Sequence, residues 1–327
     1  MPVRLTVHIE RWPIAGTFVI SRGAKTEAVV VVAELRDGPL TGRGECVPLD
    51  HYNQTVESEA AAIEGMAEAI AGGLDRQALQ HALPAGPARN ALDCAFWDLE
   101  AKRAGKPAHE LAELSALRPV TTALTISLGT PESMAEAALK AAHRQLLKIK
   151  LGGDGDPARI AAVRNAAPLA ELIVDANEAW TEENLTENLR ACAQAGVKLV
   201  EQPLAAGKDS ALASIARPID VCADESIHDR SSLSSLAGKY DAINIKLDKS
   251  GGLTEALALA HEAEGAGLAI MVGCMVSTSL AMAPAMLVAQ RASVVDLDGP
   301  LLLAKDRADG LRYEGSRVYP ANAKLWG

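Results

Sequence analysis

The amino-acid sequence predicts an α/β protein in which a parallel eight-stranded barrel follows a smaller α+β domain. The barrel is predicted by a pattern that begins near residue 121, where short apolar runs end in a polar residue and each is followed by a helix-like segment. Strands that alternate with helices in this way are typical of parallel βαβ units. Because eight such runs are present, we expect the units to close into a (β/α)₈ barrel.

The first 115 residues show a different order of predicted strands and helices. Residues 29–35 are strand-like and lead to the turn-prone pair Asp37-Gly38. Helical patterns follow at residues 58–70 and 88–103. Strands that precede helices in this order indicate an α+β unit.

The barrel strands are expected at residues 124–128, 146–151, 172–175, 199–201, 221–224, 242–247, 268–272 and 294–298. Thr130-Pro131 and Asp156-Pro157 mark helix starts, since each places a capping side chain before a proline at the first helical position. An open doubly wound sheet is the alternative, but no Gly-rich fingerprint follows the first strand. The segment after Gly299 is too long for a ninth unit, so we expect it to pack against the N-terminal region.

Composition limits the partners and the compartment. The formal net charge of −10 argues against a general nucleic-acid or anionic-membrane binder. No apolar run reaches the roughly 18 residues of a membrane span, and the first residues lack the layout of a signal peptide. The five cysteines show no CxxC spacing, which indicates reduced thiols. We therefore expect a cytoplasmic protein.

Three predicted strands end in a carboxylate: Asp175, Glu201 and Asp224, which are 26 and 23 residues apart. On adjacent barrel strands these groups would converge and raise one another's pKa. A hard divalent cation would relieve the repulsion, and an all-oxygen ligand set favours Mg²⁺ over Zn²⁺. The alternative for each residue is an ordinary solvated strand end.

Lysines mark two further strands. Lys148 and Lys150 share one face of the second strand, and Lys246 ends the sixth. Since strands two and six lie opposite each other in a ring of eight, a carbon at the centre would face a lysine on each side. Mutual repulsion and a nearby metal ion would lower the pKa of at least one lysine toward neutrality, as a general base requires. Proton removal on one face and delivery on the other would invert a stereocentre, while Lys148 stabilises the enolate charge.

These residues resemble the enolase superfamily, in its muconate-lactonizing subgroup. The resemblance covers essentially the whole chain and rests on the ordered motifs Lys148-Ile149-Lys150, Asp175-Ala176-Asn177, Glu201-Gln202-Pro203, Asp224-Glu225-Ser226 and Lys246. It implies a modified (β/α)₇β barrel at residues 116–300 and an α+β capping domain at residues 1–115, completed by residues 301–327. It also implies that Lys150 and Lys246 are the acid/base catalysts, and that Asp175, Glu201 and Asp224 hold one Mg²⁺ per subunit.

Within the subgroup the sequence is most similar to the dipeptide epimerases, including the L-Ala-D/L-Glu epimerases. The stretches 244–252, 273–275 and 296–298 support this, and Met275 is assigned to the substrate site on that basis. Asp296 and Asp298, at i and i+2 of the eighth strand, would face one way and suit a free ammonium group. A dipeptide has that group, whereas an N-acylated amino acid, a muconate or a succinylbenzoate lacks it. The alternative is that Asp296 and Asp298 are two solvated residues of a loop before Gly299.

The resemblance implies Ala-Glu from cell-wall peptide turnover as the substrate, with its far end read by the capping domain. It places mobile loops at about residues 18–25 and 47–54. Arg22 and Lys25 are the cationic candidates for a substrate carboxylate, with a basic surface loop as the alternative for either. In the first barrel strand Thr125 and Ser127 share a face and are expected to line the site, Ser127 being the better match to the family.

Other functions remain open. An N-acylamino acid racemase, an o-succinylbenzoate synthase or a cycloisomerase could use the same lysines and metal, although the Asp296 and Asp298 pair argues against them. The retained lysines and carboxylates argue against a non-catalytic binding protein on an inherited barrel. A homo-oligomer is compatible with the sequence, because many barrels of this kind assemble.

Overall fold

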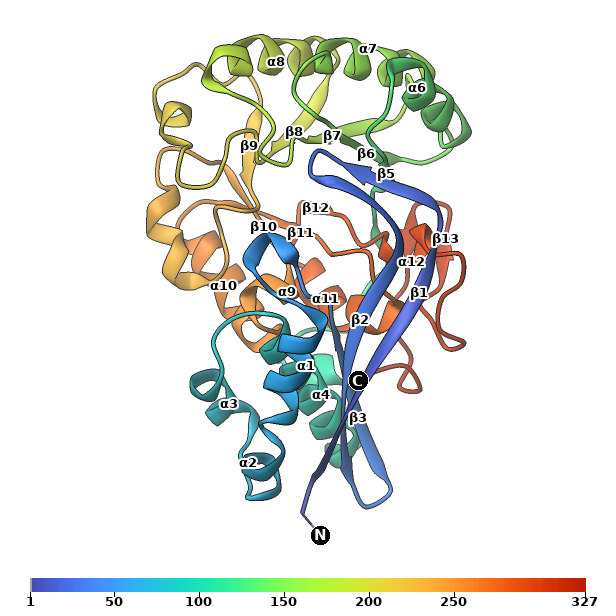
Figure 1. Ribbon diagram of the computed structural model, residues 1–327, viewed down its shortest axis with the longest axis vertical. Coiled ribbons are helices and arrows are strands. Elements are labelled where there is room, and N and C mark those ends of the chain that lie inside the picture. The colour runs from blue at the N-terminus through green and yellow to red at the C-terminus, as the bar shows by residue number, and fades with distance from the viewer. Residues whose placement is uncertain (1) are drawn as a thin grey trace.

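The computed structural model describes residues 2–327 as a barrel with a smaller domain beside it (Figure 1). The smaller domain begins with an antiparallel sheet of order β1-β2-β3, formed by β1 (Arg4–Ile20), β2 (Gly23–Asp37) and β3 (Leu40–Cys46). Its helices follow as η1 (Asp50–Tyr52), α1 (Val56–Glu64), α2 (Ala67–Ala71), α3 (Arg76–Ala82), α4 (Pro87–Ala104) and α5 (Ala108–Leu111). The predicted α+β order is confirmed, although the helix expected at residues 58–70 is divided into α1 and α2.

Eight strands in the order β12-β11-β10-β9-β8-β7-β6-β5 form the barrel sheet, and neighbouring strands pair in parallel. They are β5 (Leu124–Ile126), β6 (Leu146–Lys150), β7 (Glu171–Asp175), β8 (Val197–Glu201), β9 (Asp220–Ala223), β10 (Ala242–Ile245), β11 (Ala269–Val272) and β12 (Val294–Val295). The Ala123 N–H donates to the Val295 carbonyl at 2.8 Å and joins the two ends of the sheet. The predicted barrel is therefore confirmed.

The connections are helical, but not uniformly so. The α-helices are α6 (Pro131–Lys140), α7 (Asp156–Ala166), α8 (Glu182–Gln194), α9 (Leu247–Ser250), α10 (Leu253–Gly265), α11 (Ser279–Ala289) and α12 (Gly299–Leu302). After β8 and β9 the chain forms only the 3₁₀ turns η2 (Ser210–Ala213) and η3 (Arg230–Leu236). The expectation of a full helix after every strand is wrong at these two places.

Two local predictions also differ from the structure. Thr130 caps α6 as expected, accepting the Ser133 N–H, but Asp156 does not cap α7 in the same way. Its carboxylate accepts the Gly152 and Gly153 N–H groups at 3.1 and 2.8 Å, and so fixes the loop before the helix. The eighth strand is also shorter than predicted, since β12 ends at Val295.

The barrel interior has an apolar floor and a charged upper part. One inward residue from each of seven strand segments forms a small cluster, with Val294 packed against it: Ala123, Leu146, Ile173, Leu199, Cys222, Ala242 and Met271. Because side chains alternate along a strand, the next inward positions lie two residues further on. In β6 these positions are Lys148 and Lys150, and in β7 the position is Asp175. The alternation therefore directs the predicted site residues into the barrel above the floor.

The C-terminal segment contacts both the start of the barrel domain and the capping domain. A small sheet of order β13-β14-β4 pairs β13 (Tyr313–Glu314) and β14 (Arg317–Val318) with β4 (Val120–Thr121). Trp326 Nε1 donates to the Cys94 carbonyl at 3.0 Å, and the Gly327 N–H donates to Asp98 at 2.7 Å. Both acceptors are on α4, so the end of the chain is held on the central helix of the N-terminal domain.

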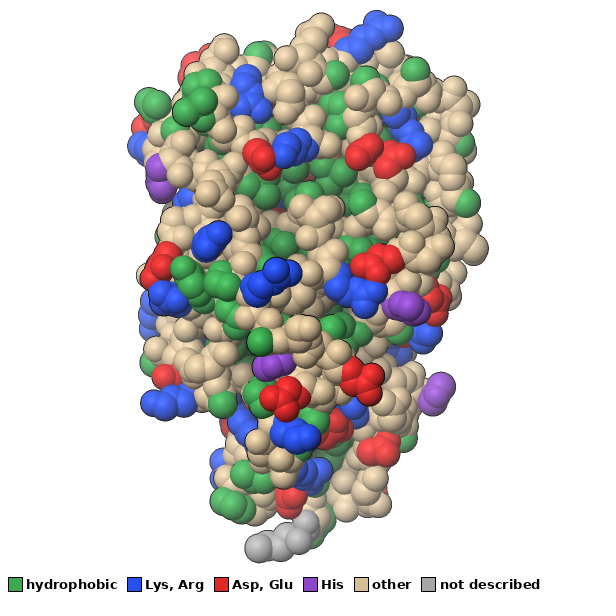
Figure 2. All heavy atoms as spheres, turned by 180° about the vertical axis from the view of Figure 1, so that it is seen from behind, with side chains coloured by type: hydrophobic (Ala, Val, Ile, Leu, Met, Phe, Trp, Pro, Cys, Tyr) green, Lys and Arg blue, Asp and Glu red, His purple; other side chains and the backbone are tan. Residues whose placement is uncertain are grey.

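The cysteines agree with the expectation of reduced thiols. Figure 2 shows basic and acidic side chains interspersed over one face of the molecule. Within residues 2–327 no helix has the length and apolarity needed to cross a membrane. All five cysteines lie in this range and are free thiols.

The approach of β3 to α4 gives the first testable prediction. A Cβ at Gly44 would lie 2.8 Å from the Ala95 backbone nitrogen and closer still to the Ala91 carbonyl oxygen. We expect Gly44→Ala to lower the free energy of unfolding by about 1–3 kcal/mol, because an added carbon in a filled interior forces shifts. Urea unfolding, monitored by circular dichroism, measures this change in the free energy of unfolding. Gly265→Ala on α10, where a Cβ meets nothing within 4 Å, is the control and should not destabilise the protein.

Candidate active site

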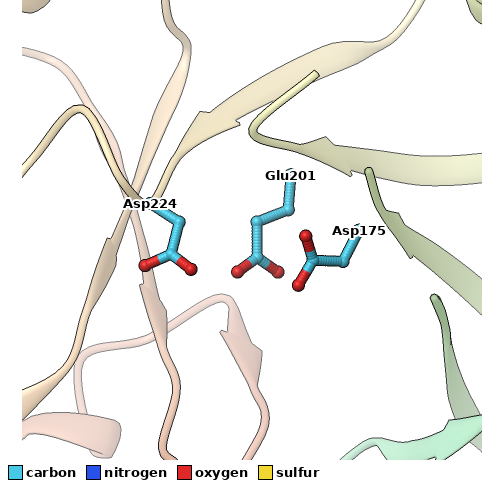
Figure 3. A group of neighbouring side chains, drawn as sticks. All are labelled: Asp175, Glu201 and Asp224. Atoms are coloured by element: carbon cyan, nitrogen blue, oxygen red, sulfur yellow. The ribbon is translucent and has the colours of Figure 1, made fainter. Parts of the chain in front are cut away.

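Three carboxylates converge at the ends of adjacent barrel strands, as Figure 3 shows for Asp175, Glu201 and Asp224. Asp175 and Glu201 end β7 and β8, and Asp224 follows β9 directly. Each is buried, and one oxygen from each lies within 4.8 Å of the others. This all-oxygen set fits a hard divalent cation such as Mg²⁺.

Lys148 is almost completely buried among three carboxylates. Its Nζ is 2.6 Å from Glu201 Oε2, 2.8 Å from Asp296 Oδ2 and 3.1 Å from Asp175 Oδ2, and the side chain is only 1% exposed. Burial by itself would lower the pKa of Lys148, but the three carboxylates raise it well above its usual value. Lys148 is therefore the common counterion of three strand ends.

Lys150 is the last residue of β6, and Lys246 directly follows β10, which lies four strands from β6 in the sheet order. Lys150 Nζ is 2.6 Å from Asp175 Oδ2, and Lys246 Nζ is 2.6 Å from Asp224 Oδ2. Burial acts to lower the pKa of Lys246, yet Asp224 and Glu201 raise it. The sequence predicts a lowered pKa for at least one of Lys148 and Lys150, but for Lys148 the direction is the opposite, because the facing carboxylates outweigh the effect of burial.

The three carboxylates differ in their environment. Burial, followed by Asp175, raises the pKa of Glu201 to about 8. Burial also acts to raise the pKa of Asp175 and Asp224, but adjacent lysines lower both below their usual values. A bound cation would stabilise the Glu201 carboxylate against this burial and against the repulsion from Asp175.

Asp296 and Asp298 lie beyond the end of β12, in the turn that leads to α12. They are nevertheless buried, which argues against a solvated loop pair. Asp298 Oδ2 accepts the Thr125 N–H at 2.7 Å, and burial together with Asp296 raises its pKa to about 7. Asp296 Oδ1 is buried and has no hydrogen-bond partner among the described residues. An unpaired buried carboxylate oxygen of this kind is costly unless a donor is supplied.

The other predicted substrate residues are dispersed. Thr125 lies on β5 and holds Asp298, whereas Ser127 lies just past β5 and accepts the Val19 N–H at 3.4 Å. Met275 is half-buried in the loop after β11 and packs on the main apolar core. Ser127 therefore contacts the β1–β2 hairpin directly.

The β1–β2 hairpin extends across the barrel mouth (Figure 1), and its turn contacts the loop that follows β7. At its turn Arg22 contacts Glu225 at 2.7 Å, Glu178 at 3.2 Å and the Asn177 carbonyl at 3.1 Å. Burial acts to lower the pKa of Arg22, but Glu225 and Glu178 raise it. Lys25 is exposed on β2 opposite Phe18. The hairpin thus brings Arg22, rather than Lys25, onto the barrel.

A second capping segment meets the same part of the barrel. His51 Nε2 lies 3.2 Å from the Glu178 carboxylate that also contacts Arg22. The Tyr52 ring packs edge-on against His228 at 4.7 Å between ring centres. The expected loops at residues 18–25 and 47–54 therefore both lie on the barrel mouth.

Sequence reasoning missed two buried residues next to the carboxylates. Asn244 Nδ2 donates to Glu201 Oε1 at 2.7 Å, and its position two residues before Lys246 on one strand face was an available signal. Lys249, one turn beyond Lys246, donates to Asp224 and to the Asn244 carbonyl. No sequence pattern marked it, because its contact depends on the fold of α9.

Comparison with known proteins identifies matches along nearly the whole chain. Residues 3–112 match the mandelate racemase / muconate lactonizing enzyme N-terminal domain, and residues 132–320 match the enolase C-terminal domain-like family. The L-Ala-D/L-Glu epimerase of Escherichia coli K12 is 46% identical over 96% of this chain and 98% of its own. An N-acetyl-D-glutamate racemase from a Pseudoalteromonas species is 43% identical over 91% of this chain and 95% of its own.

Solved structures agree with these matches. An enolase family member from Agrobacterium tumefaciens with homology to dipeptide epimerases, crystallised with sodium and L-Ala-L-Glu, is 54% identical over all of both chains, with a TM-score of 0.99. The dipeptide epimerase of Enterococcus faecalis V583, complexed with Mg and L-Leu-L-Tyr, is 29% identical over 100% of this chain and 99% of its own, with a TM-score of 0.91.

The position of Lys148 gives the second prediction. In EDTA at pH 8, we expect Lys148→Met to lower the free energy of unfolding by about 3–5 kcal/mol, because Asp175, Glu201 and Asp296 lose their shared counterion. Adding Mg²⁺ should raise the melting temperature more in this variant than in the wild type. Lys140→Met, which removes an exposed ion pair with Glu136, is the control and should unfold like the wild type. Equal stability of both variants in EDTA would contradict the role given to Lys148.

Proposed function

Because the chain belongs to the mandelate racemase and muconate lactonizing enzyme family of the enolase superfamily, we propose that it is a Mg²⁺-dependent dipeptide epimerase that interconverts L-Ala-L-Glu and L-Ala-D-Glu. The family and its epimerase and racemase relatives make the protein an isomerase of amino acid derivatives. The reaction proposed is a 1,1-proton transfer at the α-carbon of the C-terminal residue.

Lys150 and Lys246 are proposed as the two acid/base catalysts. Their positions four strands apart would place one ammonium or amine on each face of a substrate carbon in the barrel. The neutral lysine takes the α-proton, and the C–H electron pair moves into the adjacent carboxylate. The opposite lysine, protonated beforehand, then forms the new C–H bond on the other face.

The charge that develops on the substrate carboxylate has to be stabilised. Mg²⁺ held by Asp175, Glu201 and Asp224 would supply Lewis-acid stabilisation of that charge. Lys148, which is held by Asp175, Glu201 and Asp296, would add a preorganised positive charge. Asn244 would orient Glu201 through its 2.7 Å hydrogen bond.

The buried Asp296 and Asp298 pair is the observation that carries the choice of a dipeptide. A free α-ammonium group would supply the donor that Asp296 Oδ1 lacks and would offset the buried negative charge. Arg22, with Lys25 as the second candidate, would bind the glutamate side-chain carboxylate, and Thr125, Ser127 and Met275 would line the remaining site. The cocrystallised L-Ala-L-Glu of the Agrobacterium protein supports this choice of substrate.

The biological setting follows from the substrate. L-Ala-D-Glu derives from murein peptides, so we propose a role in the recycling of cell-wall peptides in the cytoplasm. An N-acylamino acid racemase is the second candidate, favoured by the 43% identity to an N-acetyl-D-glutamate racemase. A substrate without an ammonium group would leave Asp296 Oδ1 without a donor and would supply no cation beside Asp298, so this candidate is weaker.

The two-lysine reaction predicts isotope exchange. With Mg²⁺ in D₂O, L-Ala-L-Glu should gain deuterium at the glutamate α-carbon and form L-Ala-D-Glu, and EDTA should suppress both, as followed by NMR and chiral chromatography. Lys150→Ala and Lys246→Ala should each lower epimerisation by roughly 100-fold or more, since each removes an acid/base group. Lys198→Ala, an exposed lysine paired with Glu171, is the control. If no dipeptide of an L,L library takes up deuterium, the epimerase proposal is wrong.

Recognition of the amino end gives a separate prediction. Asp296→Asn and Asp298→Asn should each raise the KM for L-Ala-L-Glu by roughly 10- to 100-fold, because a bond between charged groups contributes about 1.5–3 kcal/mol. Asp298 does not contact Lys148, so a shared KM effect can be assigned to the ammonium group. N-acetyl-L-glutamate should be the poorer substrate of the wild type. A lower KM for N-acetylglutamate than for the dipeptide would instead support the racemase alternative.

A further inference from the structure

The capping-domain helix α4 is bonded directly to α9, the short helix that follows Lys246. Asn90 Nδ2 donates to Asp248 Oδ1 at 2.8 Å. Arg89 Nε and Nη2 donate to the carbonyl oxygens of Gly251 and Ser250 at 3.1 and 2.7 Å. All of these groups are buried, so water does not compete for the contacts.

Further hydrogen bonds join the capping domain to α9 and to the residues that follow it. Asp248 Oδ1 also accepts the Val47 N–H at 3.1 Å, at the base of the second capping segment. One turn further along α4, Asp93 accepts the Thr254 N–H at 2.9 Å. The stretch after Lys246 is therefore held by α4 over two turns of that helix.

The backbone of Lys246 depends on α9. Strand β10 ends at Ile245, and Lys246 is the N-cap residue of α9. The N–H groups of Lys249 and Ser250 donate to the Lys246 carbonyl at 3.0 Å each. Lys246 is thus fixed by a helical turn rather than by a strand ladder.

Lys150 is held differently. It is the last residue of β6 and is paired in register with Asp175 of β7. The parallel ladder of the barrel sets its backbone position. The two proposed catalysts therefore have different supports, one within the barrel sheet and the other through the capping domain.

From this geometry we infer that α4 positions Lys246 for catalysis, with Asn90 and Asp248 as the positioning residues. The inference rests on the proposed two-lysine reaction and deepens it. The capping domain would then do more than cover the substrate, because it would place one of the two acid/base groups. Lys150 should be independent of it.

Isotope exchange can separate the two lysines. In D₂O, Lys150 takes the α-proton of one epimer, and the electron pair moves into the substrate carboxylate. Return of a deuteron from the Lys150 ammonium gives exchange with retention, whereas a deuteron from Lys246 on the opposite face gives inversion. The ratio of exchange with retention to inversion therefore reports on the placement of Lys246, and a general loss of folded enzyme leaves the ratio unchanged.

The test uses Asn90→Ala in the full-length protein with Mg²⁺ and L-Ala-L-Glu or L-Ala-D-Glu in D₂O. Lys246→Ala first identifies which epimer still exchanges and so depends on Lys150. For that epimer, Asn90→Ala should raise the ratio of exchange to inversion roughly 10- to 100-fold, since a displacement of about 1 Å slows a transfer by this order. Asp98→Asn, on the same helix but bonded to Gly327, is the matched control and should keep the wild-type ratio.

A second pair of variants separates geometry from charge. Asp248→Asn keeps an oxygen that can accept both bonds, and its ratio should stay near that of the wild type. Asp248→Ala removes the acceptor and should raise the ratio as Asn90→Ala does. If Asn90→Ala does not fold, the comparison of Asp248→Ala with Asp248→Asn still tests the positioning role.

The outcomes distinguish the inference from the function on which it rests. A wild type that neither exchanges nor inverts would refute the proposed epimerase. An active wild type with an unchanged ratio in Asn90→Ala and Asp248→Ala would refute only the positioning role. Exchange and inversion that fall together in these variants would also refute it, because the defect would then not be confined to Lys246.

Discussion

The charges buried inside the barrel constrain the rest of this structure. Lysines and carboxylates lie together within or next to the strand ends, among them Lys148, Lys150, Lys246, Asp175, Glu201 and Asp224, and each of these is almost inaccessible to water. A buried charge is tolerated only when it is paired and hydrogen-bonded. The lysines meet this condition through contacts with carboxylates from different strands, so that Lys148 alone contacts three elements. The strand ends must therefore stay in register for the interior to be stable, and the apolar floor beneath them provides that register.

Much of the fold and the central site could be predicted from the sequence, because both follow from local periodicity. Alternation along a strand places Lys148 and Lys150 on one face, and the repeated run ending in a carboxylate places Asp175 beside Glu201. The predicted eighth strand is too long, because an apolar run does not show where the hydrogen bonding between strands ends. Asp296 and Asp298 are nevertheless buried, since the chain beyond β12 still packs inside the barrel.

Features that depend on contacts between distant segments could not be predicted. The pairing of Arg22 with Glu225 joins residues 203 positions apart, and no local pattern encodes it. Lys249 reads as an ordinary helix residue until α9 turns it toward Asp224. The raised pKa of Lys148 and Lys246 has the same origin, because the number of facing carboxylates is a property of the closed barrel.

The return of the C-terminal segment to α4 has a consequence for how the protein is made. A ribosome releases the β1–β3 sheet and α4 long before Trp326 and Gly327, whose bonds to that helix form only after both residues have emerged. Domains generally fold in order of synthesis. Here α4 is translated before the barrel strands but receives these two bonds only after them, so the nascent barrel must form while its neighbour still exposes the surface of α4 that residues 326 and 327 cover.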